Sequence, residues 1–181
     1  MIEADKNTGQ IIFLVGARAA GKTTIGRRLA RELAMEFVDT DLYLTETHGL
    51  TVAEIVARDG WEGFRRWESE ALRAAATPGR VIATGGGMVL AEPNRDFMRA
   101  NGLVFYLAAP AEVLGARLAV DPQAAQRPSL TGNSVTEEVA RVLRDREDLY
   151  QSAAHQVINA AEALETVIGN ILTLVSKYRE P

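Results

Sequence analysis

The sequence contains no cysteine among its 181 residues. Disulfide bonds, thiolate metal sites and cysteine nucleophiles are therefore excluded. The chain also has no apolar run near the roughly 20 residues that cross a bilayer. Its first nine residues (MIEADKNTG) are too polar and too acidic for a signal or transit segment. We expect a soluble, cytoplasmic protein with no membrane partner.

An excess of positive charge is missing as well. The 20 Lys and Arg residues are outnumbered by 24 Asp and Glu residues, which gives a net charge of −4. A general nucleic-acid surface needs clustered basic residues to match the phosphate charge, so we expect no nucleic-acid partner. The remaining composition is ordinary, with 47% apolar and 24% charged residues. The length suits one domain over residues 1–181.

Short apolar runs alternate with helical patterns along the chain. The candidate strands lie at 10–15, 35–41, 80–87, 103–109 and 155–159. Apolar spacing, capping signals and closing glycines predict helices at 23–34, 51–60, 61–76, 94–102, 110–120, 134–154 and 161–178. This alternation predicts an α/β fold in which helices cover both faces of a parallel sheet. Residues 121–133 have no periodicity and contain two prolines, so we expect a mobile loop there.

The stretch VGARAAGKTT (15–24) has the phosphate-loop spacing G-x-x-x-x-G-K-[ST] between a strand and a helix. Gly16 and Gly21 allow backbone angles that side chains block, so successive amides can turn toward phosphate oxygens. The N-terminus of the following helix adds positive potential. Lys22 is expected to contact the β- and γ-phosphates, and the Thr23 hydroxyl to ligate Mg²⁺. We therefore predict nucleotide binding rather than a glycine turn with a surface lysine.

Two aspartates, Asp39 and Asp41, close the second candidate strand. Ligands of parallel sheets collect beyond the carboxyl ends of strands, which places both acids beside the phosphate loop. Residues i and i+2 of an extended chain point the same way. One acid could then hold Mg²⁺ or its water, while the other orients an attacking hydroxyl. Alternatively, Asp41 caps the helix that follows. The residues alone leave these two interpretations equal.

Three consecutive glycines, 85–87, follow the third candidate strand. A tight turn rarely needs three, and a strand end without side chains lets a substrate lie on the backbone, so a binding site is favoured. Arg65 and Glu68 are three residues apart on one helix face, which is enough for a surface ion pair of about 0.2–0.5 kcal/mol. Taken alone, Arg127, Arg144 and Arg146 are predicted to be solvated charges.

Together, these motifs resemble the shikimate kinase family, most closely its type II form. The matching segments cover about residues 10–178 in family order: VGARAAGKTT, FVDTDLYL, TVAEIVARDGWEGFRRWESEAL, VIATGGGMVL, QRPSLTG and REDLYQ. The resemblance implies a three-layer P-loop kinase of the nucleoside-monophosphate-kinase-like fold, with a five-stranded parallel sheet and a mobile lid at about 120–134. It also implies transfer of the γ-phosphoryl group of MgATP to the 3-hydroxyl of shikimate, in the pathway to chorismate and aromatic amino acids, by a monomer.

The resemblance also implies roles for individual residues. Lys22, Asp41 and Arg127 are implied as catalytic residues, and Thr23 and Asp39 as metal neighbours. The implied ATP-binding set is Gly16, Ala17, Arg18, Ala19, Ala20, Gly21, Lys22, Thr23, Thr24, Arg117 and Arg127. The implied shikimate-binding set, drawn partly from helices at about 41–76, is Arg18, Asp41, Arg65, Glu68, Gly86, Gly87 and Arg146. Arg65 and Arg146 would hold the carboxylate and Glu68 would support Arg65, while Arg18 either reaches the same carboxylate or is a spare surface arginine.

The chain departs from the family pattern in two loops. Alanine stands at position 19, where glycine is usual, and a positive φ there would cost about 1 kcal/mol or more. Asn159 ends the last candidate strand where the family has Asp, and Leu164 stands near an expected proline, which leaves the adenine contacts at 158–164 open. Two other functions remain: a kinase of related fold acting on gluconate or a nucleoside monophosphate, and an ATP-binding module without catalysis.

Overall fold

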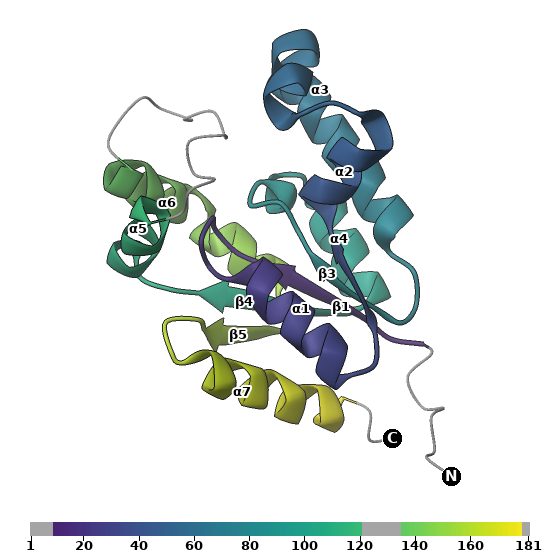
Figure 1. Cartoon of the computed structure of the whole chain (residues 1–181), viewed down its shortest axis with the longest axis vertical. Helices are drawn as coiled ribbons and strands as arrows, with labels where there is room; N and C mark the ends of the chain where they lie inside the picture. Colours follow the sequence, from purple (N-terminus) through teal and green to yellow (C-terminus); the bar gives the residue numbers. More distant parts are fainter. Residues whose placement is uncertain (1–8, 121–134, 179–181) are drawn as a thin grey trace.

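A computed structural model describes residues 9–120 and 135–178, and five strands in these residues form one parallel sheet (Figure 1). The strands are β1 (Ile11–Val15), β2 (Glu36–Asp39), β3 (Arg80–Ala83), β4 (Leu103–Ala108) and β5 (Gln156–Asn159). Their order is β2-β3-β1-β4-β5, and all neighbours are parallel. Because β3 and β4 flank β1 on opposite sides, the loop after β1 lies where the topology opens a crevice for ligands.

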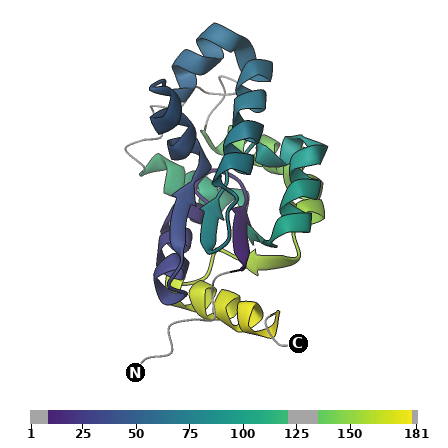
Figure 2. The ribbon, with the colours of Figure 1, turned by 90° about the vertical axis from the view of Figure 1, so that its right-hand side faces the viewer.

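Helices cover both faces of the sheet (Figures 1 and 2). On one face lie α1 (Lys22–Glu32) and α7 (Leu164–Lys177), and on the other lie α4 (Glu92–Asn101) and α6 (Val135–Ala153). The helix α5 (Ala111–Ala119) packs against α6, and a 3₁₀ turn, Met88–Leu90, follows β3. The remaining pair, α2 (Thr40–His48) and α3 (Val52–Ala75), packs together and projects beyond the sheet (Figure 2). None of the helices in the described ranges has the length and apolarity of a membrane-spanning segment.

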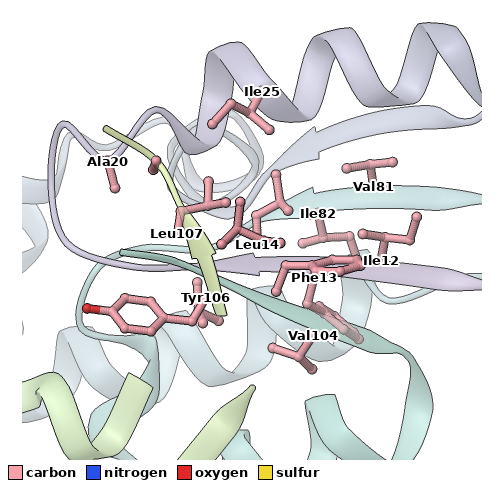
Figure 3. Packing of buried hydrophobic residues seen from close by; sticks show 14 of the residues in the cluster. Ile12, Phe13, Leu14, Ala20, Ile25, Val81, Ile82, Val104, Tyr106 and Leu107 are labelled. Atoms are coloured by element: carbon pink, nitrogen blue, oxygen red, sulfur yellow. The ribbon is translucent and has the colours of Figure 1, made fainter. Parts of the chain in front are cut away.

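The hydrophobic core lies around β1, which is buried at every residue. A central parallel strand is covered on both faces, so its sequence is a continuous apolar run rather than an alternating one. Figure 3 shows Phe13 and Leu14 of β1 among side chains of β3, β4 and α1. A second, smaller cluster of buried residues joins α2 to α3 and consists of Leu44, Ile55, Phe64 and Ala71.

Most predicted elements are present, with a few shifted ends. The strand β2 ends at Asp39 and residues 40–48 are helical, so the expectation of an extended chain through Asp41 is wrong. The last helix begins at Leu164 rather than at 161. Thr51 and Glu54 form the predicted capping box, and Gly60 interrupts α3 with φ 69° and ψ 177°. Apart from Val120, the lid expected at about 120–134 lies outside the described residues.

Candidate active site

The loop between β1 and α1 lines a cavity of about 500 Å³. Gly16 and Gly21 have φ angles of 148° and 93°, in the region that favours glycine. The Lys22 ammonium donates hydrogen bonds to the carbonyls of Gly16 and Ala17, both at 2.7 Å. Lys22 therefore curls back over the loop beside the N-terminus of α1, where backbone N–H groups and the helix dipole attract a phosphate. Ala20, Thr23 and Thr24 also line the cavity.

Ala19 has a φ of 61°, which is the positive value that strains a residue with a β-carbon. A left-handed conformation costs a residue with a β-carbon about 1–2 kcal/mol. Arg117 holds the strained residue from outside the loop: its guanidinium donates to the Ala19 carbonyl at 3.3 Å and to the Ala160 carbonyl at 2.8 Å. Arg117 thus ties the phosphate loop to the segment that follows β5.

The segment between β5 and α7 forms another part of the cavity wall through Ala160 and Glu162, and Leu164 at the start of α7 adds to it. Asn159 orders this turn with its own side chain. Its Oδ1 accepts from the N–H of Ala161 at 3.1 Å, and its Nδ2 donates to Glu162 Oε1 at 3.0 Å. Residues within 158–164, the segment for which the sequence leaves the adenine contacts open, therefore line the cavity.

Asp39 uses both oxygens of its carboxylate. Oδ1 accepts from the N–H groups of Asp41 at 3.1 Å and Leu42 at 3.4 Å, so Asp39 is the N-cap of α2. Oδ2 accepts from the Thr23 hydroxyl at 2.8 Å. The interpretation of Asp41 as the cap is therefore wrong. Asp41 stands in the first turn of α2 and lines the cavity together with Asp39.

Thr23 and Asp39 have the chemistry of a magnesium site. A hydroxyl and a carboxylate 2.8 Å apart offer the oxygen ligands that Mg²⁺ prefers. In phosphate-transfer sites this ion keeps several waters and needs only one or two protein oxygens, because the substrate phosphates supply others. Within residues 9–120 and 135–178, no three acidic, histidine or cysteine side chains gather into an all-protein metal site. The oxygens of Thr23 and Asp39 could thus hold Mg²⁺ together with substrate phosphates.

The glycine triplet after β3 lies against charged side chains. A β-carbon at Gly87 would collide with the Arg65 guanidinium. A β-carbon at Gly85 would lie 2.6 Å from Asp41 Oδ1 and 2.8 Å from Glu68 Oε1. A side chain at either position would displace the charged ends of these side chains, so the glycines leave room for the carboxylates and the guanidinium of α2 and α3.

Arg65 and Glu68 form an ion pair on α3, in which the Arg65 guanidinium donates to Glu68 Oε2. Glu68 is only 3% exposed, so this is not the surface pair that the spacing alone suggested. Burial raises the pKa of Glu68 to about 7, against the opposing effect of the Arg65 guanidinium; the nearby Asp41 carboxylate adds to the increase.

Arg146 reaches the triplet from α6, whereas Arg65 reaches it from α3. Its Nη1 donates to the carbonyl of Gly86 at 3.1 Å, and the Tyr150 hydroxyl donates to the same carbonyl at 2.7 Å. Arg65 and Arg146 thus meet at neighbouring glycines although they come from different helices. Sequence reasoning missed Tyr150, and the available signal was its position four residues after Arg146, on the same helix face.

The fold thus brings most of the predicted site residues to one place. Arg18 lines the cavity, and its backbone nitrogen would be 3.8 Å from a β-carbon at Gly86. The glycine triplet therefore touches the phosphate loop as well as the arginines. Arg127 lies outside the described residues, so its part in the site stays a prediction.

Comparison with known proteins decides the family. A family model described as shikimate kinase matches residues 18–176. The chain belongs to the shikimate kinase family. A shikimate kinase 2 from Syntrophotalea carbinolica is 64% identical over 168 residues, which cover 93% of this chain and 98% of that protein. A shikimate kinase 2 from Dickeya chrysanthemi is 59% identical over 161 residues, covering 89% and 93% respectively.

A solved structure of a shikimate kinase gives the same result. The enzyme from Acinetobacter baumannii, in complex with shikimate, has a TM-score of 0.87 at 33% identity and covers 97% of both chains. The predicted family, the three-layer fold with its parallel sheet, and the expectation of an ATP-dependent kinase are confirmed.

Proposed function

We propose that this shikimate kinase family member transfers the γ-phosphoryl group of ATP to the 3-hydroxyl of shikimate, giving shikimate 3-phosphate and ADP. One observation carries the proposal: two guanidinium groups, from Arg65 and Arg146, meet at a glycine triplet that borders the phosphate-loop cavity. Two planar cations suit a single carboxylate, which each can bind in a bidentate manner. The carboxylate of Asp41 beside them suits an acceptor hydroxyl.

On the nucleotide side, residues 16–24 are proposed to surround the phosphates, with Lys22 contacting the β- and γ-phosphates. Arg117, which lies between the phosphate loop and the segment after β5, is proposed to lie beside the adenine. Thr23 and Asp39 would hold Mg²⁺, which neutralises phosphate charge when it is bound. A loose phosphoryl-transfer transition state needs this kind of positioning and charge neutralisation rather than covalent help.

On the acceptor side, Arg65 and Arg146 are proposed to grip the shikimate carboxylate, with Glu68 holding Arg65 in place. Asp41 would orient the 3-hydroxyl and accept its proton. Gly86 and Gly87 would contact the ring substituents, since neither glycine has a side chain of its own that would keep a small ring away from the backbone. Arg18, on the cavity wall, is proposed to reach toward the same carboxylate.

The remaining expectations complete the proposal. We propose that residues 1–181 act as one monomeric domain in the cytoplasm, where ATP is available. Arg127 is proposed to belong to a lid that closes over ATP and excludes water. Gel filtration at assay concentration tests the monomer, because a dimer would elute at twice the chain mass of 19.7 kDa.

The decisive experiment measures ADP release by the purified protein with MgATP, with and without shikimate. We expect shikimate-dependent release that is lost in Lys22→Met. If the wild-type protein releases no more ADP than Lys22→Met, the proposed function is wrong. The same assay with gluconate and nucleoside monophosphates tests a related kinase. Tight nucleotide binding without turnover of any acceptor would instead identify a binding module.

A further inference from the structure

Tyr150 lies against the glycine triplet and has no role in the reaction as described so far. The residue stands on α6 and is fully buried, with 0% of its surface exposed. A buried tyrosine hydroxyl needs a hydrogen-bond partner. Here the partner is the carbonyl of Gly86, 2.7 Å away, which also accepts from Arg146 Nη1 at 3.1 Å.

A second tyrosine, Tyr106 of β4, stacks on Tyr150 with ring centroids 5.1 Å apart and an interplanar angle of 18°. Its hydroxyl points away from the aliphatic cluster in Figure 3 and donates to Glu147 Oε2 at 2.7 Å. The hydroxyls of the two stacked rings therefore have different partners. The Tyr106 hydroxyl binds a side chain of α6, whereas the Tyr150 hydroxyl binds the backbone of the glycine triplet. Burial raises the pKa of the Tyr150 hydroxyl, which keeps it protonated as a donor.

The hydrogen bond to Gly86 has a geometric consequence for Gly87. In a planar trans peptide the C=O and the following N–H point in opposite directions. Because the Gly86 carbonyl is turned toward α6, the N–H of Gly87 is turned away from α6. A hydrogen bond to the carbonyl also polarises the peptide group and strengthens its N–H as a donor. Tyr150 thus sets both the direction and the strength of a backbone donor at the residue that the Arg65 guanidinium contacts.

The shared carbonyl matters when Arg146 moves. If Arg146 turns its Nη1 from Gly86 to a substrate carboxylate, the carbonyl loses one of its two donors. This carbonyl is partly buried, and leaving such an acceptor without any partner costs free energy. Tyr150 keeps the carbonyl paired, so Arg146 can change partners while the peptide keeps its orientation.

We propose that Tyr150 is a positioning residue for shikimate: its hydroxyl holds the Gly86–Gly87 peptide so that the Gly87 N–H is presented to the substrate between Arg65 and Arg146. This inference rests on the proposed function. Tyr150 touches neither substrate, because its ring is buried and its hydroxyl is bound to Gly86.

The test is Tyr150→Phe, which keeps the ring and removes only the hydroxyl. Tyr106→Phe is the matched control, because it removes a hydroxyl from the ring stacked on Tyr150 without touching the triplet. We expect Tyr150→Phe to lower kcat/KM for shikimate about tenfold, mainly through KM, which corresponds to about 1.4 kcal/mol. The KM for ATP should change by less than about twofold, and Tyr106→Phe should leave both KM values within that range.

A readout without turnover is the amide resonance of Gly87 in ¹⁵N-labelled protein. It should shift in Tyr150→Phe and stay in place in Tyr106→Phe, since only the former removes a bond to the Gly86 carbonyl. An unchanged shikimate KM, equal losses for both substrates, equal losses in both variants, or unfolding of Tyr150→Phe would each overturn the inference. If the wild type does not turn over shikimate, the proposed function fails, and an unshifted Gly87 resonance would overturn the inference separately.

Discussion

The phosphate loop and the α2–α3 pair contribute to the same site, but they rest on cores of very different size. The loop follows β1, whose buried residues belong to a cluster that runs through the sheet and the helices on both faces. The α2–α3 pair, which contains Asp41, Arg65 and Glu68, is joined by a separate cluster of only four buried residues within the described ranges.

In the proposed function, this difference sets how each substrate would be held. The phosphate side depends on backbone geometry fixed by a large core. The acceptor side depends on side chains fixed by a small core and by charge pairing, as in the buried Arg65–Glu68 pair. Regions with few buried apolar contacts open at a lower free energy than the rest of a protein. We therefore expect damage to the α2–α3 pair to affect shikimate much more than ATP.

The largest expected effect is that of Ile55→Ala, in the small cluster. Ile55 is fully buried, and truncating it should lower the free energy of unfolding by about 2–5 kcal/mol. Urea unfolding and steady-state kinetics should show a raised KM for shikimate with a nearly unchanged KM for ATP. Ile12→Ala, the same change at a fully buried residue of β1, is the control and should not separate the two substrates. If the KM for ATP rises as much as the KM for shikimate in Ile55→Ala, the small cluster does not serve the shikimate side alone.

Arg65→Ala should lower kcat/KM for shikimate about 10- to 150-fold, because a charged hydrogen bond contributes about 1.5–3 kcal/mol. ATP affinity, measured by titration, should barely change. Arg66→Ala is a close control, since Arg66 is the next residue, its side chain is 66% exposed and it pairs with Glu62 on the surface. Equal damage to both substrates in Arg65→Ala would contradict its assignment to shikimate.

The buried Glu68 gives a pH dependence that Glu68→Gln should remove. Its pKa rises from 4.5 to about 7 on folding, so the folded protein binds this proton more tightly than the unfolded chain. The resulting stability is fully present below pH 4.5 and is lost as the pH rises through about 7. The stability of the wild type relative to Glu68→Gln should therefore fall between these two pH values in urea unfolding experiments.

Activity should show the opposite trend. The ionised carboxylate pairs best with Arg65, so kcat/KM for shikimate should rise with pH through about 7 in the wild type. Glu62→Gln, which removes a carboxylate that is 93% exposed on the same helix, should keep this rise. If Glu68→Gln keeps it too, another group titrates and Glu68 does not set the orientation of Arg65.

Ala19→Gly should have the smallest effect. Removing about 1–2 kcal/mol of left-handed strain is partly offset by the greater freedom of glycine in the unfolded chain, about 0.4–1 kcal/mol. The net gain is then at most about 1.6 kcal/mol, which would raise the Tm by at most about 6 °C. Ala34, with φ 52°, is the matched position because it does not line the cavity. Both glycine variants should gain stability, but only Ala19→Gly should alter the KM for ATP.

Local patterns predicted much of this molecule. The phosphate loop, the capping box at Thr51 and the break at Gly60 follow from residues close together in sequence, and the structure contains all three. The alternation of strands and helices likewise predicted the layers. These features depend on backbone angles and hydrogen bonds within a few residues, which the sequence specifies directly.

Other features depend on contacts that only the folded chain makes. The spacing of Arg65 and Glu68 is the same for a surface pair and a buried one, and the burial of Glu68 depends on the triplet that packs against it. Tyr106 and Tyr150 stack from a strand and a helix far apart in sequence. One of the two interpretations of Asp41 places the cap of α2 two residues too late, because the cap depends on where β2 ends, and β2 ends at Asp39.

The carboxylate of Asp39 connects the two halves of the proposed site, because its two oxygens have different partners. One oxygen caps the helix whose first turn contains Asp41, and the other binds the hydroxyl proposed to meet the metal. A cation bound at Thr23 and Asp39, as proposed above, would therefore also act on the start of that helix. Whatever factor this contributes to shikimate affinity, shikimate must contribute the same factor to the affinity of the cation, because the binding cycle closes. In the proposed site, one side chain would thus make the cation and shikimate effectors of each other.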